Sequence, residues 1–193
     1  MDIMIKKTRP EYRLIERFRH YGQWYADIRA YIVQNYADPD LFADLLSATS
    51  PRQTVKENWK LANRIYREHK VGLPYSRIGL LPCHTANIDR AILGQELSGN
   101  KVRSFSKNLR GDFEHVTVDV WILRFFGYSG DSAPSGSQYA DIVKRIKCIA
   151  KRYQTTPAAM QAILWTIARH NAGFGPSSFL GETRQQTFDF AKE

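Results

Sequence analysis

Cysteine is scarce in this sequence: Cys83 and Cys148 are the only two among 193 residues, and they do not form a Cys-x-x-Cys pair. A disulfide framework, a zinc site and an iron–sulfur cluster each need more cysteines than that. His84 and His115 have no second ligand at metal-binding spacing, so both are expected to be core or surface residues. We therefore expect no metal, no iron–sulfur cluster and no other cofactor.

Long apolar runs are also missing. No segment approaches the roughly 18 apolar residues that a membrane-spanning helix needs. The N-terminal stretch MDIMIKKTRP lacks the apolar core of a signal peptide. These absences predict a cytoplasmic protein with reduced thiols and no membrane partner.

Acidic residues are in deficit. The chain has 28 lysines and arginines against 19 aspartates and glutamates, a net charge of +9, and an isoelectric point near 9.6. Such an excess favours a polyanionic partner, and nucleic acid ahead of a membrane because no basic amphipathic helix stands alone with a purely apolar face. A basic soluble protein without such a partner would have the same composition, so charge alone leaves both alternatives open.

Alternating strand patterns are absent, whereas helical spacing runs through most of the chain. With 43% hydrophobic and 12% aromatic residues, the chain has enough apolar surface for a substantial core. Between Tyr12 and Tyr36, apolar residues recur every three or four positions, which predicts one amphipathic helix. Its expected buried stripe comprises Leu14, Phe18, Tyr21, Tyr25, Ile28 and Ile32. We predict an all-α fold.

Capping residues divide the pattern into further helices. Asp38, Ser50, Thr85 and Thr156 each precede a helical pattern, and side chains of these types accept hydrogen bonds from the first free amides of a helix. Ser50 and Gln53 also fit a capping box. We therefore expect a helix to begin directly after each of the four positions.

Residues 127–137, GYSGDSAPSGS, form a linker-like stretch. The whole chain, residues 1–193, is interpreted as a single all-α domain. A central lobe would span about 41–127 and contain a tight hairpin at 97–101. The N-terminal helix and residues 138–193 would form a second lobe.

The hairpin segment LSGNK has a physical use. Glycine lets the chain reverse tightly, so that successive amides point outward at the start of the next helix. Such amides, together with the helix dipole, bind a phosphate without reading the base. Many Ser-Gly-Asn turns are merely turns, so both interpretations stay open. On the first interpretation, the DNA contacts would be Ser98, Gly99, Asn100, Arg103, Ser104 and Lys107.

Asp119 stands in the apolar run VTVDVW, beside a short helix expected from about 118 to 126. A lone buried carboxylate costs several kcal/mol unless it is paired or hydrogen-bonded. In one interpretation Asp119 is only the N-cap of that helix. In the other, the helix N-terminus holds an ionised carboxylate in place for chemistry.

Two groups of side chains on predicted helices also have two interpretations. One helical face carries Gln161, Trp165 and Arg169, and the N-terminal helix carries Tyr21, Trp24 and Tyr25. Both sets suit contact with DNA or stacking on a flipped base. The helical spacing favours core packing for both.

Lys101 and Asp119 lie 18 positions apart, separated by one short helix and a loop. In this the chain resembles the helix–hairpin–helix DNA glycosylases, the endonuclease III-like superfamily. Their pattern is a hairpin of the form L-P-G-V-G-x-K, a helix, a loop, and V-D-T-H at the head of another helix. The segment LLSATS is similar to the LLSAQ segment of that superfamily, and the resemblance spans roughly Leu41 to Gly127. The segment TTPAAMQAILWTIAR is more loosely similar to small phage and mobile-element proteins.

This resemblance implies a helix–hairpin–helix glycosylase domain that acts on double-stranded DNA as a monomer. Asp119 would stabilise the positive charge that develops on the deoxyribose. Lys101 would either contact a phosphate or attack C1′ and allow strand cleavage. Thr49 and Trp121 stand where the superfamily has glutamine and histidine, and they would line the base pocket. The hairpin has one glycine where the superfamily pattern has two.

The sequence therefore predicts an enzyme that flips a nucleotide and cleaves its N-glycosidic bond, with AP-lyase activity depending on the role of Lys101. Because two motif positions differ from those expected of a housekeeping repair enzyme, the hypothesis includes a modified target base. One version is a hypermodified phage base excised as host defence. The alternatives are a non-catalytic helix–hairpin–helix DNA-binding protein and an enzyme of a phage's own nucleic-acid metabolism.

Overall fold

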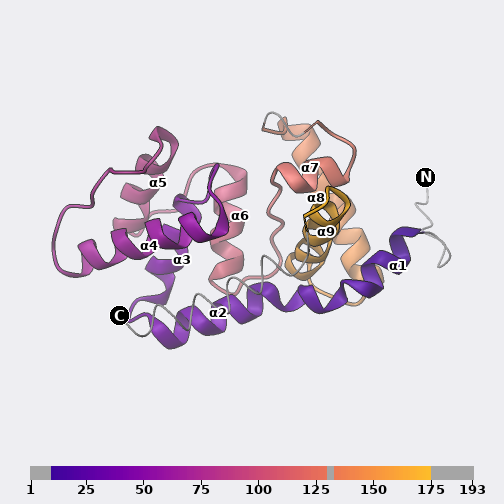
Figure 1. Ribbon diagram of the computed structural model, residues 1–193, viewed down its shortest axis with the longest axis horizontal. Coiled ribbons are helices and arrows are strands. Elements are labelled where there is room, and N and C mark those ends of the chain that lie inside the picture. The colour runs from indigo at the N-terminus through magenta and orange to yellow at the C-terminus, as the bar shows by residue number, and fades with distance from the viewer. Residues whose placement is uncertain (1–9, 130–132, 175–193) are drawn as a thin grey trace.

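The computed structural model describes residues 10–129 and 133–174, and helices make up most of these ranges (Figure 1). No β-strand occurs within them, which confirms the predicted all-α class. The elements in chain order are α1 (Pro10–Arg17), the 3-10 helix η1 (Arg19–Gln23), α2 (Trp24–Asn35), α3 (Pro39–Ala48), α4 (Val55–Lys70), α5 (Pro82–Ile92), α6 (Asn100–Leu109), α7 (Val120–Phe125), α8 (Gly136–Arg152) and α9 (Pro157–Asn171).

Two apolar cores organise these helices. The first core is built from α2 to α6 and receives Ala158 and Ala162 from α9. The second is built from α1, residues 116–123, α8 and α9. In Figure 1, α1, η1 and α2 run along one side of both groups of helices. The first core therefore holds α6 in place, and the second holds α7.

The division between the cores differs from the lobe boundaries that the sequence suggested. The central lobe was expected at about 41–127, but α2 contributes Ile28 and Ile32 to the first core. Ile122 and Leu123 of α7 pack in the second core instead. The cause is that α7 packs against α9, a long-range contact that helical periodicity does not specify. Residues 175–193 of the expected second lobe lie outside the described residues.

The predicted single helix from 12 to 36 is divided in three. The chain forms α1, then the 3-10 turn Arg19–Gln23, then α2. Gly22 lies in that turn close to α9: a Cβ placed there would stand 3.4 Å from both Ala159 Cβ and Ile163 Cδ1. The turn thus redirects the chain where it contacts α9.

Two of the four predicted caps are confirmed. Asp38 accepts a hydrogen bond from the Leu41 amide at 3.1 Å and opens α3. Thr156 accepts one from the Ala159 amide at 3.2 Å and opens α9. In both cases proline occupies the first helical position, where its missing N–H costs nothing.

The other two predicted caps are wrong. The helix after Ser50 begins only at Val55, where Thr54 caps the Glu57 amide at 3.2 Å. Arg52 takes a left-handed conformation in between, with φ of +58°, so Ser50 cannot be the cap. Helix α5 begins at Pro82, three residues before Thr85.

At the start of α5, the hydrogen bonds expected of Thr85 are made instead by a buried histidine, His84. His84 is fully buried, and its Nδ1 accepts a hydrogen bond from the Leu81 amide at 3.1 Å. Its Nε2 lies 2.9 Å from the Pro51 carbonyl oxygen. Because Nδ1 accepts, Nε2 carries the proton and donates it to Pro51. His84 thereby fixes the turn at 50–54 against α5, and the expectation of a structural histidine is confirmed.

Within residues 10–129 and 133–174, no helix is both long enough and apolar enough to cross a bilayer.

The two candidate caps of α4 can be separated by mutation. Thr54→Ala should lower the free energy of unfolding by about 1 kcal/mol, because the Glu57 amide loses its acceptor. Ser50→Ala should not lower it, since the buried Ser50 hydroxyl has no hydrogen-bond partner to lose within the described residues. Urea denaturation followed by circular dichroism measures both. An equal loss in the two variants would restore the capping box at Ser50.

Candidate functional site

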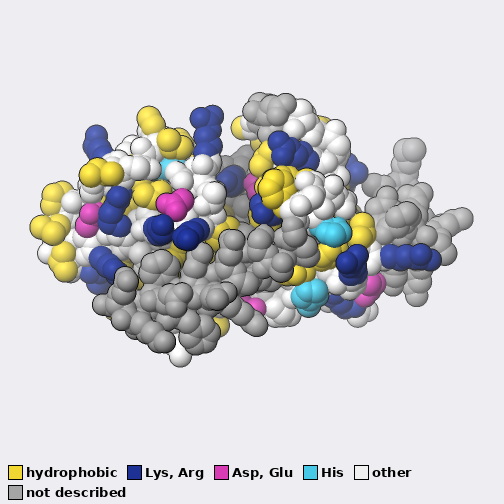
Figure 2. All heavy atoms as spheres, viewed as in Figure 1, with side chains coloured by type: hydrophobic (Ala, Val, Ile, Leu, Met, Phe, Trp, Pro, Cys, Tyr) yellow, Lys and Arg dark blue, Asp and Glu magenta, His cyan; other side chains and the backbone are white. Residues whose placement is uncertain are grey.

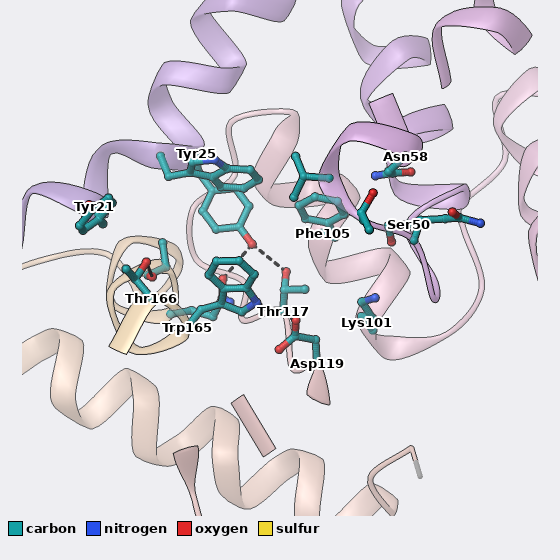
Figure 3. A pocket seen from close by; sticks show the side chains of 16 residues that line it. Tyr21, Tyr25, Ser50, Asn58, Lys101, Phe105, Thr117, Asp119, Trp165 and Thr166 are labelled. Carbon is teal, nitrogen blue, oxygen red and sulfur yellow. Dashed lines mark hydrogen bonds between the residues drawn. The ribbon is translucent and has the colours of Figure 1, made fainter. Parts of the chain in front are cut away.

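A cavity lies between the two cores and encloses about 710 Å³ of empty space, part of it open to solvent. Five aromatic side chains stand in its wall, together with two ionisable groups, Lys101 and Asp119 (Figure 3). The aromatic residues are Tyr21, Trp24, Tyr25, Phe105 and Trp165.

Asp119 is held by three N–H donors. Its Oδ1 accepts hydrogen bonds from the Trp121 and Ile122 amides, each at 3.0 Å. Its Oδ2 accepts one from the Trp165 indole N–H at 2.8 Å. The first two bonds confirm that Asp119 caps α7. The same carboxylate also lines the cavity, so the capping role and a place in a functional site coincide.

The surroundings shift the pKa values of both ionisable groups. Burial raises the pKa of Asp119, while the α7 amides, the Lys101 charge and the Trp165 indole oppose that rise. Burial lowers the pKa of Lys101, and the Asp119 charge opposes that fall. Opposite shifts in two groups facing one cavity are typical of functional sites.

Lys101 extends into the cavity without a partner. Among the described residues its ammonium group makes no hydrogen bond and no ion pair within 4.0 Å, yet the side chain is half-buried. Figure 3 shows Lys101 and Asp119 on the same side of the cavity. Their spacing in the sequence therefore predicted that they share a site.

Asn87 of α5 fixes the backbone of the hairpin. Its Oδ1 accepts a hydrogen bond from the Ser98 amide at 2.7 Å, and its Nδ2 donates to the Ser98 carbonyl at 3.1 Å. The Ser98 amide is thus occupied, so the predicted contact of Ser98 with DNA would have to be made by its exposed side chain. Gly99 adopts a φ of +90°, a conformation that favours glycine. The Gly99 and Asn100 amides have no partner within the described residues, and remain candidates.

Ser104 is corrected as a DNA contact. It is 9% exposed, and its hydroxyl lies 2.8 Å from the Tyr139 hydroxyl. Tyr139 in turn donates to the Val116 carbonyl at 2.8 Å, so Ser104 is the donor of the first bond. This chain connects α8 to α6. Arg103 is exposed and Lys107 half-exposed on α6, where a phosphate can reach them.

Neither residue predicted to line the base pocket does so. Thr49 is fully buried, and its hydroxyl contacts the Leu45 carbonyl at 2.9 Å and Asn58 Oδ1 at 2.6 Å. Trp121 lies outside the cavity lining. The guanidinium groups of Arg124 and Arg169 lie over its ring, 4.9 and 5.4 Å from the centroid. The Thr49 hydroxyl is thus engaged by α3 and α4, and the Trp121 ring packs with arginine side chains outside the cavity.

Several cavity residues were assigned to the core or missed. Gln161, Trp165, Tyr21, Trp24 and Tyr25 were expected mainly as core residues, and all five line the cavity. No sequence pattern predicted a place in the site for five further residues that line the cavity, Ser50, Gln53, Asn58, Phe105 and Thr117. Ser50 and Gln53 enter the wall through the turn at 50–54, whose conformation depends on His84 rather than on its own residues.

The described residues contain no group of three or more histidine, cysteine, aspartate or glutamate side chains placed to hold a metal ion. The chemistry available to this cavity therefore rests on one carboxylate, one amine, an aromatic wall and several amides and hydroxyls.

Residues 17–172 match the model of DUF7178, a family of unknown function, and the chain belongs to that family. The matched range contains nearly all of both cores and every residue that lines the cavity. No curated protein and no solved structure matches the chain.

The coupling between Lys101 and Asp119 is measurable. In the wild type, the Asp119 carboxyl should titrate above the 3.8 of an ordinary aspartate. Lys101→Met should raise its pKa further, because the positive charge that favours the carboxylate is removed. Carbon-13 NMR of the carboxyl group measures the pKa. Lys107→Met, on the same helix, is the control and should leave it unchanged. An unaltered pKa in Lys101→Met would show that the ammonium points away from Asp119.

Proposed function

We propose that the protein is a helix–hairpin–helix DNA glycosylase that holds a flipped nucleotide in the cavity between the two cores. One observation carries this proposal: Asp119 and Lys101, the two residues picked out by motif spacing, face the same aromatic-walled cavity. An aromatic wall suits a base, which offers a flat apolar face for stacking. The carboxylate and the amine suit the sugar and its phosphates.

The proposed reaction breaks the bond between C1′ of the deoxyribose and a ring nitrogen of the base. The bonding electrons leave with the base, and positive charge develops on the sugar. A fixed carboxylate close to C1′ lowers the energy of that charge in the transition state. Water then adds to C1′, its hydroxyl remains on the sugar, and its proton passes to the departing base.

The hydrogen bonds of Asp119 suit this role. An electrostatic stabiliser must already be in place when charge develops, because reorganisation during the reaction is costly. Three donors from α7 and α9 hold the carboxylate. An oxygen of a carboxylate has two lone pairs, and Oδ2 uses only one of its pair among the described residues. Asp119 therefore retains the capacity to interact with a ligand in the cavity.

DNA would be held by its backbone at the N-terminus of α6. Unpaired amides and the helix dipole attract phosphate there. Arg103 and Lys107 lie further along the same helix, and the net charge of +9 favours binding to any polyanion. Figure 2 shows lysine and arginine side chains on both groups of helices. These contacts would position the duplex without selecting a sequence.

The target base is proposed to be a modified one, including the hypermodified bases of phage DNA as a defence role. The support is that the cavity is partly open to solvent, so that a substituent on the base could extend out of it. A non-catalytic DNA-binding protein is the second candidate. The capping bonds of Asp119 favour it, since they account for the presence of that residue without any chemistry.

Substitution of Asp119 separates these two candidates. Asp119→Asn retains a capping oxygen but cannot stabilise a cation by charge. The substitution should remove about 3–4 kcal/mol of transition-state stabilisation and therefore slow base release several hundredfold, while DNA affinity persists. The assay measures free base from duplexes carrying uracil, oxidised, alkylated or glucosylated hydroxymethyl bases. Asp112→Asn, an exposed acid in the preceding loop, is the matched control. Unreduced release by Asp119→Asn would contradict the catalytic role.

Lys101 decides between a simple glycosylase and a glycosylase with lyase activity. A nucleophilic amine would form a Schiff base with the opened sugar, which borohydride reduces to a stable adduct. Because only the neutral amine attacks and burial lowers the pKa of Lys101, adduct formation should rise with pH around a midpoint below 10.5. Lys101→Ala should abolish adduct and strand cleavage. If Lys101 only contacts phosphate, the wild type gives no adduct, and Lys101→Ala weakens binding while releasing base at saturating DNA.

A further inference from the structure

Gln161 of α9 is a buried amide that does not use all of its hydrogen-bonding capacity. It is 4% exposed and lines the cavity. Its Oε1 accepts a hydrogen bond from the Tyr25 hydroxyl at 2.8 Å. Its Nε2 has no partner among the described residues. Nε2 is not among the fully enclosed polar atoms that lack a partner, so it is accessible from the cavity that Gln161 lines, where a ligand can accept a hydrogen bond from it.

A chain of hydrogen bonds orients this amide. Gln161 Oε1 only accepts, so the Tyr25 hydroxyl donates to it at 2.8 Å, and the same hydroxyl is also directed at the Thr117 hydroxyl, 3.2 Å away. Thr117 then accepts from Asn108 Nδ2 at 3.4 Å. Of the two contacts made by the Tyr25 hydroxyl, the one to Gln161 is the shorter. It therefore fixes the Gln161 oxygen against Tyr25 and leaves the NH₂ group for the cavity.

The position of Gln161 relates it to the edge of a bound base. Gln161 and Trp165 are neighbours on one face of α9, separated by about one helical turn, ~5.4 Å along the axis. Trp165 holds Asp119 through its indole nitrogen. A base whose sugar lies at Asp119 would extend past Trp165 and present its far edge to Gln161. That edge carries the exocyclic group at C4 of a pyrimidine or C6 of a purine.

The geometry points to Gln161 as the residue that selects the base, by donating a hydrogen bond to an exocyclic carbonyl at this far edge. A base with an amino group there places two donors against each other and leaves the Gln161 NH₂ unpaired. The substrate class is therefore a base with a carbonyl at C4 or C6. This inference rests on the proposed function, since it takes the occupant of the cavity to be a base.

Matched nucleosides test the selection without requiring catalysis. Deoxyuridine has a carbonyl at C4 where deoxycytidine has an amino group. Deoxyinosine has a carbonyl at C6 where deoxyadenosine has an amino group. Because Trp24 and Trp165 line the cavity, tryptophan fluorescence reports binding. The wild type should bind the carbonyl member of each pair roughly tenfold more tightly, as expected when one buried donor gains or loses its acceptor. Base release from duplexes containing the same four bases is measured in parallel.

Three variants isolate the amide. Gln161→Met keeps similar volume without a donor, and should bring the preference close to one. Tyr25→Phe leaves Gln161 intact but removes the hydroxyl that orients it, and should reduce the preference without abolishing binding. Thr166→Val is the control: its hydroxyl already donates to the Ala162 carbonyl at 2.9 Å, so the preference should be unchanged.

The outcomes distinguish the inference from the proposed function. Discrimination between nucleosides that disappears in Gln161→Met, without base release from any duplex, supports the inference and refutes the glycosylase. Base release with no carbonyl preference, or with a preference that survives in Gln161→Met, overturns the inference and leaves the glycosylase standing. Absence of both binding and release overturns both.

Discussion

The burial of a single carboxylate is the constraint on which the site depends. Asp119 lies against the second core, where an unpaired charge would cost several kcal/mol. The three donors that offset this cost come from two elements, the N-terminus of α7 and Trp165 of α9. These bonds tie the start of α7 to one face of α9. Gln161 lies on the same face of α9 and lines the cavity. The contacts between α7 and α9 therefore determine both where the Asp119 carboxylate lies and where Gln161 lies.

The hairpin and the first core fix the other side of the cavity. Asn87 holds both backbone groups of Ser98, and Tyr139 joins α8 to Ser104 and Val116. These contacts place Lys101 at the start of a helix that is anchored at both its faces. The chain from Asn108 through Thr117 and Tyr25 to Gln161 then crosses from α6 to α9. Polar contacts between the two cores therefore decide which side chains meet.

Local chemistry was predictable from the sequence, and long-range packing was not. Asp38 and Thr156 cap helices because a cap depends on residues within one turn. Ser50 and Thr54 both satisfy that pattern, and only the bond from His84 to Pro51, 33 residues away, decides between them. Lys101 and Asp119 were found because a motif preserves their spacing. Trp165 and Gln161 share a helical stripe with core residues, and periodicity cannot tell a core face from a cavity wall. Thr49 and Trp121 failed because sequence alignment with a motif does not give side-chain direction.

Several polar side-chain groups that line the cavity have no hydrogen-bond partner among the described residues. The Ser50 hydroxyl is buried without a partner, the Gln161 amide nitrogen donates to nothing within the described residues, and the Lys101 amine is half-buried and unpaired. A buried polar group without a partner, such as the Ser50 hydroxyl, lowers stability by about 1–3 kcal/mol relative to a satisfied or apolar one. Ser50, Gln161 and Lys101 all line the same cavity as the Asp119 carboxylate. Stability lost at one place in this way is typical of a site shaped for a ligand. Together with the aromatic wall, these polar groups favour a polar, flat occupant for the cavity independently of the motif.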